Sequence, residues 1–369
     1  MVREGRWAGL RWLVVSGTRH EVFRSLGRWA RSDVQAALVE SAPDRAILRR
    51  WADTAEGKAC FGPVLAATER DYGTQLAELE GLAEGAGVPV EDLLLTSLRG
   101  DFGTAARMGC STLAWRRETT VVAHNEDGDP RLDGCLMLLT LLVEGEAAVT
   151  ALWYPGTLPT NAFVATSQGL AWGINHIPAV RPSSAGAGRH FVARALHQAA
   201  TLDEAVAHLR THPSAGGFTY TIAEAASGRA AVVEAVAGRV AVVEATPDDP
   251  LHWHTNHLRH IPDPPDLPPA DPQAAEVRGR YAESIARGRV LSGLTPGPAE
   301  SPSTWYLQAL CSAPLPHGVY RTAASPDPLM TLCTVIADMS NDTITIRRRT
   351  GETATCSLTD FTQGVPVTP

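Results

Sequence analysis

Residues 109–127 read GCSTLAWRRETTVVAHNED, and this stretch marks the point at which the chain changes character. Before it, apolar residues recur at the spacing of a helix, as in residues 64–86. Within it, the runs CSTLAW and TTVVAH are separated by a charged turn, which is typical of two antiparallel strands. Further strand-like runs follow as far as residue 177. The sequence therefore predicts that a block of strands begins at Cys110.

The rest of the chain alternates between blocks of helices and blocks of strands. Helical patterns cover residues 190–200, 274–291 and 304–310. Strand patterns return in FTYTIAEA, RAAVVEA, RVAVVEA and LHWHTN, and in a final pair, TLCTVIAD and TITIRRR. This order predicts two packed sheets with helices outside, which is a four-layer αββα sandwich of the α+β class. We expect residues 1–109 to form a mainly helical N-terminal segment that precedes the strand-rich part, residues 110–369.

The composition is that of an ordinary globular protein. The chain has 369 residues, of which 44% are hydrophobic and 20% charged. Its net charge of -8 provides no basic field to hold phosphates, so nucleic acid is not an expected partner. Apolar runs fall short of the roughly 20 residues that cross a bilayer, so no membrane association is expected. The start, MVREGRWAGLRWLVVSG, suggests a signal peptide, but Arg11 interrupts its apolar run. We therefore predict a strand near residues 13–15 and a cytoplasmic location.

The six cysteines are scattered and form no CxxC pair, which argues against a disulfide framework or a zinc finger. Cys135 and Cys333 lie in apolar runs and are expected to be small buried hydrophobes. Cys110 differs because it stands among polar and small residues. A cysteine at a chain terminus has its own α-amino group as a base, with a pKa of about 8. Creating that amine requires cleavage after Gly109, whose missing Cβ tolerates a strained backbone. A purely structural Gly-Cys pair is the alternative.

Several motifs together resemble those of a known enzyme family. GCST, followed by HNED at the end of the next strand, is similar to the isopenicillin N acyltransferase family, which includes carcinine and β-alanyl-dopamine hydrolases. Residues 78–101 and 161–175, and the motifs AVVEA, HTNH and TLCTVIAD, occur in the order of that family. Bile salt hydrolases and penicillin V acylases are similar more distantly.

The resemblance implies the fold of N-terminal-nucleophile hydrolases and a self-processing amidohydrolase or acyltransferase. Its substrate would be an amide-linked, N-acyl small molecule, and the reaction would pass through a thioester on Cys110 without any cofactor. After self-cleavage, residues 1–109 would be the α piece and residues 110–369 the β piece, and the two would stay associated. The acyl group, the amine and the choice between hydrolysis and acyl transfer stay open, as does the oligomeric state.

The resemblance also assigns a role to each matched residue. Cys110 matches the nucleophile, and Gly109 matches the residue released at the new carboxyl end. Asp127 in HNED matches the aspartate that holds the amino group of the nucleophile; a turn residue is the alternative. Asn256 in HTNH matches a donor to the oxyanion of the tetrahedral intermediate. The alternative for Asn256 is a strand-end residue that caps a loop.

Four more residues are candidates for the lining of the pocket. Asn175 occupies the place where the distant relatives offer a second polar group near the oxyanion, and a turn residue is its alternative. His124 lies where bile salt hydrolases carry an arginine. The relatives also carry an arginine at a serine-containing helix start. Here Arg280 is followed by tyrosine, but glycine replaces the serine. Arg321 is a second candidate because it comes shortly before the last strand pair. Such an arginine would favour the thiolate and bind a substrate carboxylate, and a solvated helix surface is the alternative for both.

Two other classes of protein compete with this interpretation. The first is a zinc-dependent hydrolase, because His252, His254, His257 and His260 crowd one segment and the first two share a strand face. No HExxH motif or separate carboxylate motif accompanies them, so we expect no metal site. The second is a self-processing protein without catalytic turnover.

Overall fold

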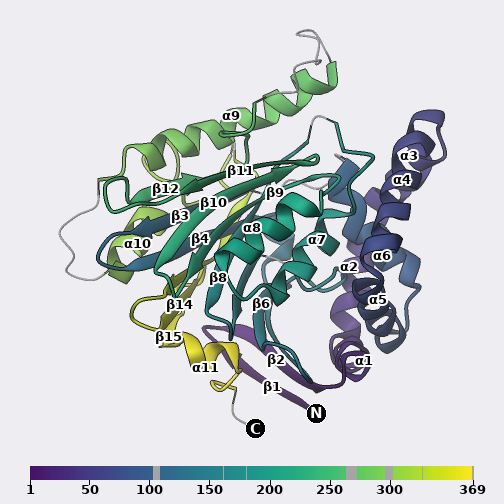
Figure 1. Ribbon diagram of the computed structural model, residues 1–369, viewed down its shortest axis with the longest axis horizontal. Helices are drawn as coiled ribbons and strands as arrows, with labels where there is room; N and C mark the ends of the chain where they lie inside the picture. The colour runs from purple at the N-terminus through teal and green to yellow at the C-terminus, as the bar shows by residue number, and fades with distance from the viewer. Residues whose placement is uncertain are drawn as a thin grey trace.

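The computed structural model describes residues 1–102, 109–160, 162–179, 181–262, 272–295, 302–325 and 327–367. In this part of the chain two β-sheets are stacked face to face, and helices cover both outer surfaces (Figure 1). The αββα sandwich that was predicted from the order of the elements is thereby confirmed.

The larger sheet has nine strands among the described residues, in the order β1-β2-β5-β6-β7-β8-β9-β10-β11. Their bounds are β1 Val2–Trp7, β2 Leu10–Gly17, β5 Met137–Val143, β6 Val149–Trp153, β7 Phe163–Thr166, β8 Leu170–His176, β9 Gly217–Glu224, β10 Arg229–Val236 and β11 Arg239–Glu244. Neighbouring strands are antiparallel except for β2 and β5, which run parallel with Trp12 beside Leu138. The start of the chain is thus joined to a strand more than a hundred residues later.

The smaller sheet has six strands among the described residues, in the order β12-β3-β4-β13-β14-β15, all antiparallel. Their bounds are β3 Gly109–Arg116, β4 Thr120–Gly128, β12 Leu251–His254, β13 Met330–Asp338, β14 Thr343–Arg348 and β15 Thr353–Ser357. The hairpin of β3 and β4 contains GCST and HNED, and β12 lies beside β3. This sheet therefore brings GCST and HNED next to the strand that leads into HTNH.

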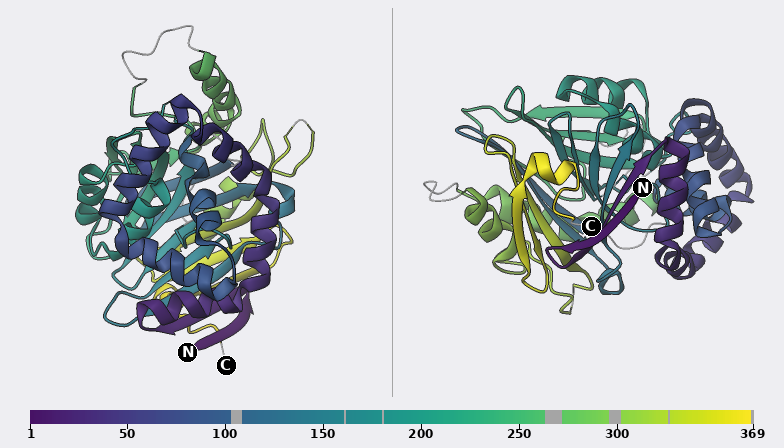
Figure 2. Two further views of the ribbon diagram at one scale, coloured as in Figure 1. Left: turned by 90° about the vertical axis from the view of Figure 1, so that its right-hand side faces the viewer. Right: turned by 90° about the horizontal axis from the view of Figure 1, so that it is seen from below.

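Most helices lie in the two outer layers, whereas α11 (Leu358–Thr362) packs its buried residues into the core between the sheets. The bounds of the others are α1 Arg19–Trp29, α2 Arg31–Glu40, α3 Ala42–Ala52, α4 Ala55–Asp71, α5 Gly73–Ala86, α6 Val90–Leu98, α7 Arg189–Ala195, α8 Leu202–Thr211, α9 Pro272–Ser292 and α10 Pro302–Cys311. Helices α1, α2 and α5 to α8 bury their apolar faces against the larger sheet. Helices α9 and α10 lie on the opposite side, against the smaller sheet (Figure 2).

The core between the sheets follows from the two-residue period of β-strands, which sends alternate side chains to opposite faces. Trp12, Leu138 and Val232 of the larger sheet meet Val122 and Val335 of the smaller one. All five are fully buried, and burial of each such side chain contributes roughly 1.5–3 kcal/mol. The intervening residues face the helices, so each sheet is apolar on both sides.

The first strand of the chain is longer than predicted and has a partner. Instead of a short strand near residues 13–15, β1 and β2 form a hairpin whose turn holds Ala8 and Gly9 at positive φ, 47° and 74°. Residues 1–102 are mainly helical, and they also contribute this hairpin to the larger sheet.

The helical spacing of residues 64–86 extends over two helices, the end of α4 and all of α5. The helical path stops at Tyr72, whose φ of -130° is not helical, and α5 restarts at Gly73. Tyr72 is buried against the rings of His208 and His212, so tertiary packing holds it out of the helix. The prediction for Cys135 was also wrong, because its side chain is exposed just before β5; Cys333 is buried as expected.

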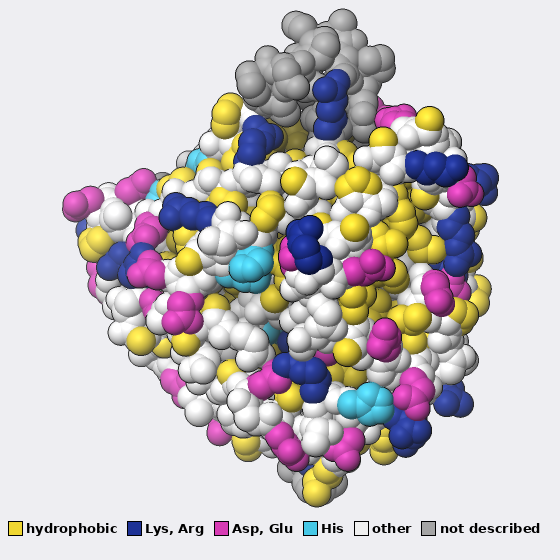
Figure 3. Space-filling model, turned by 45° about the vertical axis from the view of Figure 1, so that its right-hand side comes forward, with side chains coloured by type: hydrophobic (Ala, Val, Ile, Leu, Met, Phe, Trp, Pro, Cys, Tyr) yellow, Lys and Arg dark blue, Asp and Glu magenta, His cyan; other side chains and the backbone are white. Residues whose placement is uncertain are grey.

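The surface mixes charges of both signs, and on the face drawn in Figure 3 neither sign gathers into one patch. None of the helices in the described ranges is long and apolar enough to cross a membrane. The two ends of the chain lie close together, where Arg3 donates a hydrogen bond to the carbonyl of Val367 (Figure 1).

Candidate active site

The hairpin of β3 and β4 sets the positions of the predicted nucleophile and its neighbours. Its register pairs Gly109 with Asp127 and Cys110 with Glu126. Paired residues in antiparallel strands point to the same face of a sheet. The side chains of Cys110 and Glu126 therefore share one face. The side chain of Asp127 points to the other face, where Asn125 of the same strand donates to a carbonyl of α10.

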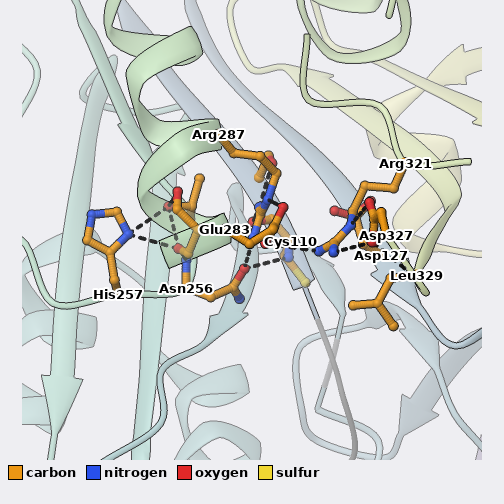
Figure 4. Close-up of polar contacts among 12 residues, drawn as sticks. Cys110, Asp127, Asn256, His257, Glu283, Arg287, Arg321, Asp327 and Leu329 are labelled. Carbon is orange, nitrogen blue, oxygen red and sulfur yellow. Dashed lines mark hydrogen bonds and ion pairs between the residues drawn. The ribbon is translucent and has the colours of Figure 1, made fainter. Parts of the chain in front are cut away.

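The backbone of Cys110 is held at both its nitrogen and its oxygen (Figure 4). Its N–H donates to Oδ1 of Asn256 at 2.9 Å. Its carbonyl accepts from Nη1 of Arg287, and this nitrogen also donates to the hydroxyl of Ser111 at 2.9 Å. Nη2 of Arg287 donates to Oδ1 of Asn256 at 2.7 Å. The three residues thus fix the peptide groups around Cys110.

Asn256 is itself fixed by a buried loop that follows β12. Its backbone N–H donates to the hydroxyl of Ser284 on α9 at 2.6 Å, and its Nδ2 donates to the carbonyl of His176 at 2.9 Å. An asparagine amide has two N–H groups, so one donor remains beyond the bond to His176. Sequence reasoning placed Asn256 next to the nucleophile, and the structure brings the two side by side.

The loop of Asn256 is anchored by the buried carboxylate of Glu234 on β10. Glu234 accepts from Nε2 of His254 at 2.9 Å and from the backbone N–H groups of Arg259, His260 and Ile261. Burial alone would raise the pKa of this carboxyl, but the bond from His254 and the backbone donors outweigh burial and lower it to about 2.

Asp127 lies beside Gly109 in a fully buried position. Its Oδ1 accepts from the hydroxyl of Thr331 at 2.7 Å, whereas its Oδ2 has no hydrogen-bond partner among the described residues. Burial raises the pKa of Asp127 to about 7, although the nearby Arg321 and Arg287 act in the opposite direction. An acceptor without a partner at this place suits the predicted role of holding an amino group.

A guanidinium group occupies the space that a side chain at position 109 would fill. A Cβ at Gly109 would lie 2.1 Å from Nη1 of Arg321 and 3.5 Å from Nη2 of Arg287. Its φ lies outside the left-handed region, so the backbone conformation does not by itself call for glycine here. Arg321 thus approaches the backbone of Gly109 closely.

Of the two predicted arginines, Arg321 is in the site. It is buried, donates to Asp327 from Nε at 2.9 Å and from Nη2 at 2.6 Å, and pairs with Glu283 at 3.4 Å. The side chain of Arg280 lies outside the described residues. Two turns further along α9, Arg287 makes the contacts to Cys110. Sequence reasoning missed Arg287, although Ser284 stands three residues before it on the same helix and binds the Asn256 loop.

The face that carries the thiol holds a second missed residue. Sγ of Cys110 donates to Oε2 of Glu126 at 3.4 Å, and Oε2 also lies 3.0 Å from Nε2 of His124. Oε1 of Glu126 accepts from the hydroxyl of Tyr154 at 2.7 Å. Burial, followed by the charges of Glu126 and Asp127, raises the pKa of the Cys110 thiol well above its usual value. The predicted pocket residue His124 is therefore part of a buried cluster around the thiol.

Asn175 lies between this cluster and the Asn256 loop. Its Oδ1 accepts from the hydroxyl of Thr112 at 2.5 Å, and its Nδ2 donates to the carbonyls of His254 and Thr255, each at 3.0 Å. Because both N–H groups are used by the loop, Asn175 braces the loop in this structure. Asn175 was predicted as a second polar group near the oxyanion, and in this structure its donors are engaged by the loop.

The histidines of the zinc hypothesis do not converge. His254 binds Glu234, whereas His257 lies 2.8 Å from the hydroxyl of Ser284 and its pKa is lowered to about 4 by burial. Across the described ranges, one set of three potential ligand atoms lies within 4.8 Å, and it belongs to Cys110, His124 and Glu126. The hydrogen bonds among these three side chains account for their closeness.

Comparison with known proteins places the chain in a family. Residues 115–351 match the family model described as acyl-coenzyme A:6-aminopenicillanic acid acyl-transferase. That match begins just after Cys110 and includes Asp127, Asn256 and Arg321. The chain is also 25% identical over 213 residues to a β-alanyl-dopamine/carcinine hydrolase of Drosophila melanogaster, covering 52% of this chain and 55% of that relative. It thus spans about half the length of the curated relative it matches.

Solved structures align more weakly. A mutant of the conjugated bile acid hydrolase of Clostridium perfringens aligns with 11% identity and a TM-score of 0.40, over 67% of this chain and 92% of that one. Penicillin V acylase of Agrobacterium tumefaciens aligns with 14% identity and a TM-score of 0.35, over 68% and 86%. The resemblance inferred from the sequence is confirmed by the family match, which spans more than half of the chain. The chain therefore belongs to the acyl-coenzyme A:6-aminopenicillanic acid acyl-transferase family.

Proposed function

We propose that this protein cleaves its own chain between Gly109 and Cys110 and then uses Cys110 as an N-terminal nucleophile. The mature site takes the acyl group of an amide-linked small molecule onto Sγ as a thioester. Water or an amine then resolves the thioester, which makes the enzyme an amidohydrolase or an acyltransferase. Nucleophile, base and oxyanion donor all come from the chain, so the proposed reaction needs no metal or organic cofactor.

The observation that carries this proposal is the way the Gly109–Cys110 peptide is held. The nitrogen of Cys110 is bound by Asn256, its carbonyl is bound by Arg287, and Gly109 is packed against Arg321. Cleavage would turn this nitrogen into an α-amine beside Asp127, whose Oδ2 has no hydrogen-bond partner among the described residues. Asp127 would then hold the α-amine in place, and the α-amine would act as the base of the mature enzyme.

The burial of the site fits an enzyme that is still in its precursor form. Cys110 is 1% exposed, and Asp127 and Asn256 are also buried. A small molecule reaches Sγ only after neighbouring chain has moved away. Release of the new carboxyl end at Gly109 would vacate the space next to Arg321 and Arg287. Two guanidinium groups there suit a substrate that carries a carboxylate or an oxygen-rich acyl group.

The catalytic cycle follows from these positions. The α-amine of Cys110 accepts the thiol proton, and Sγ attacks the substrate carbonyl. The remaining N–H of Asn256 donates to the oxyanion, and the amine part of the substrate leaves with the proton. The relative named β-alanyl-dopamine/carcinine hydrolase supports an amide of a small amine as the substrate class.

Two measurements on freshly purified protein test this proposal. Denaturing mass spectrometry should show two pieces, residues 1–109 and residues 110–369, with Cys110 at the start of the second. A panel of N-acyl amines and N-acyl amino acids should then leave an acyl group on Cys110 after an acid quench, and its mass identifies the acyl part. An active protein that shows only the intact chain would refute the mechanism, because its α-amine base would be absent.

A further inference from the structure

The thiol of Cys110 has a carboxylate partner that the proposed cycle does not use. Sγ donates to Oε2 of Glu126 at 3.4 Å, and both side chains are only 1% exposed. The two residues are direct partners in the ladder of β3 and β4, so the contact is fixed by the sheet. Tyr154 donates to the other oxygen of the same carboxylate at 2.7 Å.

Hydrogen-bond accounting locates the protons of this cluster. Nδ2 of Asn175 donates to two backbone carbonyls, so its Oδ1 is the atom that accepts from Thr112. That bond uses the only hydroxyl hydrogen of Thr112, and the hydroxyl oxygen is left to accept from Nδ1 of His124. With a hydrogen on Nδ1, one further proton lies between Nε2 of His124 and Oε2 of Glu126. The 3.0 Å contact with Nε2 of His124 holds Oε2 of Glu126 in place beside Sγ of Cys110.

The precursor needs such a group because its usual base does not yet exist. Before cleavage, the nitrogen of Cys110 is an amide that donates to Asn256 at 2.9 Å, and an amide nitrogen does not accept a proton. Burial raises the pKa of the thiol, so Cys110 is not a preformed thiolate. A neighbour must therefore remove the thiol proton while Sγ attacks Gly109.

We propose that Glu126 is the proton acceptor for Cys110 during self-cleavage and that His124 is the positioning residue that orients it. This inference rests on the proposed self-processing. The proton of Sγ passes to Oε2 of Glu126 as Sγ bonds to the carbonyl carbon of Gly109. The bond from this carbon to the nitrogen of Cys110 then breaks, and the nitrogen takes the proton back to become the α-amine. Water hydrolyses the thioester, which restores the thiol and releases the carboxylate of Gly109.

The test compares the cleavage rates of the full chain and of Glu126→Gln. Precursor is made by pulse-labelled cell-free translation in the presence of a chelator, and cleavage is followed by intact mass from about pH 6 to about pH 9. Glutamine has nearly the shape of glutamate but does not accept the proton. We expect cleavage about 10²-fold slower near neutral pH, the size typical of a lost general base. The deficit should shrink as pH rises, because hydroxide then deprotonates the thiol directly.

Two further variants separate catalysis from folding. Glu78→Gln removes another buried carboxylate, one held by Arg194 in the outer helical layer, and its cleavage rate should match that of the unmodified chain. Glu126→Asp keeps a carboxylate on a shorter stem and should cleave faster than Glu126→Gln. If the Glu126→Gln variant cleaves more slowly by the same factor at every pH, or as fast as the unmodified chain, the proposed role of Glu126 is overturned. The proposed function would not be affected by either result. An unmodified chain that stays intact would overturn the proposed function and this inference together.

Discussion

Cys110 is held at three atoms by three separate parts of the chain. Its nitrogen is bound by the loop after β12, its carbonyl by α9, and its thiol by β4. A residue held at its backbone and its side chain has little conformational freedom to lose when the reaction begins, which is the advantage of preorganisation. Burial acts against the reaction, because it raises the pKa of the thiol, and removal of the thiol proton then becomes part of the reaction.

Replacement of Cys110 separates its chemistry from that of the other buried thiol. We expect Cys110→Ala to abolish both cleavage and turnover, since no other atom replaces Sγ as the nucleophile. Cys333→Ala is the comparison variant, because Cys333 is equally buried, packs in the core between the sheets and pairs with Glu126 across β4 and β13. It should cleave normally and lose about 1 kcal/mol in the free energy of unfolding. Turnover by the Cys110 variant would rule out the mechanism.

The side chain of Asn256 offers an oxygen that accepts and N–H groups that donate, and substitutions distinguish between the two roles. Asn256→Ala should lower kcat about 10²-fold or more with little change in KM, because an oxyanion donor acts in the transition state. Asn256→Asp keeps the oxygen that binds the N–H of Cys110 but has no N–H to donate, so it should be about as slow. Steady-state kinetics on fully processed protein gives both values. Recovery of kcat in the Asp variant would assign Asn256 to holding the nitrogen instead.

Short motifs drew attention to some residues of the candidate site, whereas residues brought in by packing gave no signal in the sequence. The motifs placed Cys110, Asp127 and Asn256, and the structure assembles all three. Arg287 reaches the site through the docking of α9 on the smaller sheet, which no local pattern records. Glu126 was within reach of prediction, because it precedes Asp127 by one residue and a two-residue period puts it on the opposite face. The sequence did not reveal the register of the β3–β4 hairpin, which pairs Glu126 with Cys110.

At the scale of an element, the loop after β12 depends on one anchor. The carboxylate of Glu234 on β10 joins the larger sheet to this loop through His254 and three backbone N–H groups. These bonds act on the charged form of Glu234, and they lower its pKa from 4.5 to about 2. The loop that presents Asn256 is therefore held by an interaction that depends on pH.

The free energy of unfolding should decrease in acid as pH falls toward the pKa of Glu234. A carboxyl whose folded pKa is lowered contributes stability that is complete above the unfolded pKa of 4.5 and is lost as pH falls toward about 2. The size implied is on the order of 3 kcal/mol. Chemical denaturation at several pH values measures it. Glu234→Gln should be less stable near neutral pH and should lose less stability between pH 4.5 and about 2 than the unmodified chain does. An identical slope in both proteins would contradict this assignment.

The elements themselves were predicted well where periodicity was uniform. The strands between Cys110 and Ile177 were recognised because each alternates or forms a short apolar run between turns. The break at Tyr72 was missed because residues 64–86 keep helical spacing across it, and the interruption comes from packing against α8. The hairpin at the start was underestimated, since β1 is charged and pairs at the edge of the sheet.

At the scale of the whole molecule, the proposed cut falls between parts that share one fold. The N-terminal part supplies β1 and β2 to the larger sheet, where β2 pairs with β5. It also supplies α1, α2, α5 and α6 to the apolar core on that sheet. The strand that begins at Gly109 belongs to the smaller sheet. Cleavage would thus sever one connection and leave both pieces within the same core.

We therefore predict that the two pieces remain together after cleavage and unfold together. Leu13 and Val15 of β2 are fully buried, and each such side chain contributes roughly 1.5–3 kcal/mol to the association. Salt of about 1 M screens surface charges but does not weaken apolar burial, so size-exclusion chromatography at high salt should still give one peak with both pieces. In denaturant, separation of the pieces and loss of helix signal should coincide. Leu13→Ala should shift both midpoints down together, by about 2–5 kcal/mol in stability, since it leaves a cavity where the pieces meet. Separation at high salt with the helix signal intact would show that residues 1–109 form an independent unit instead.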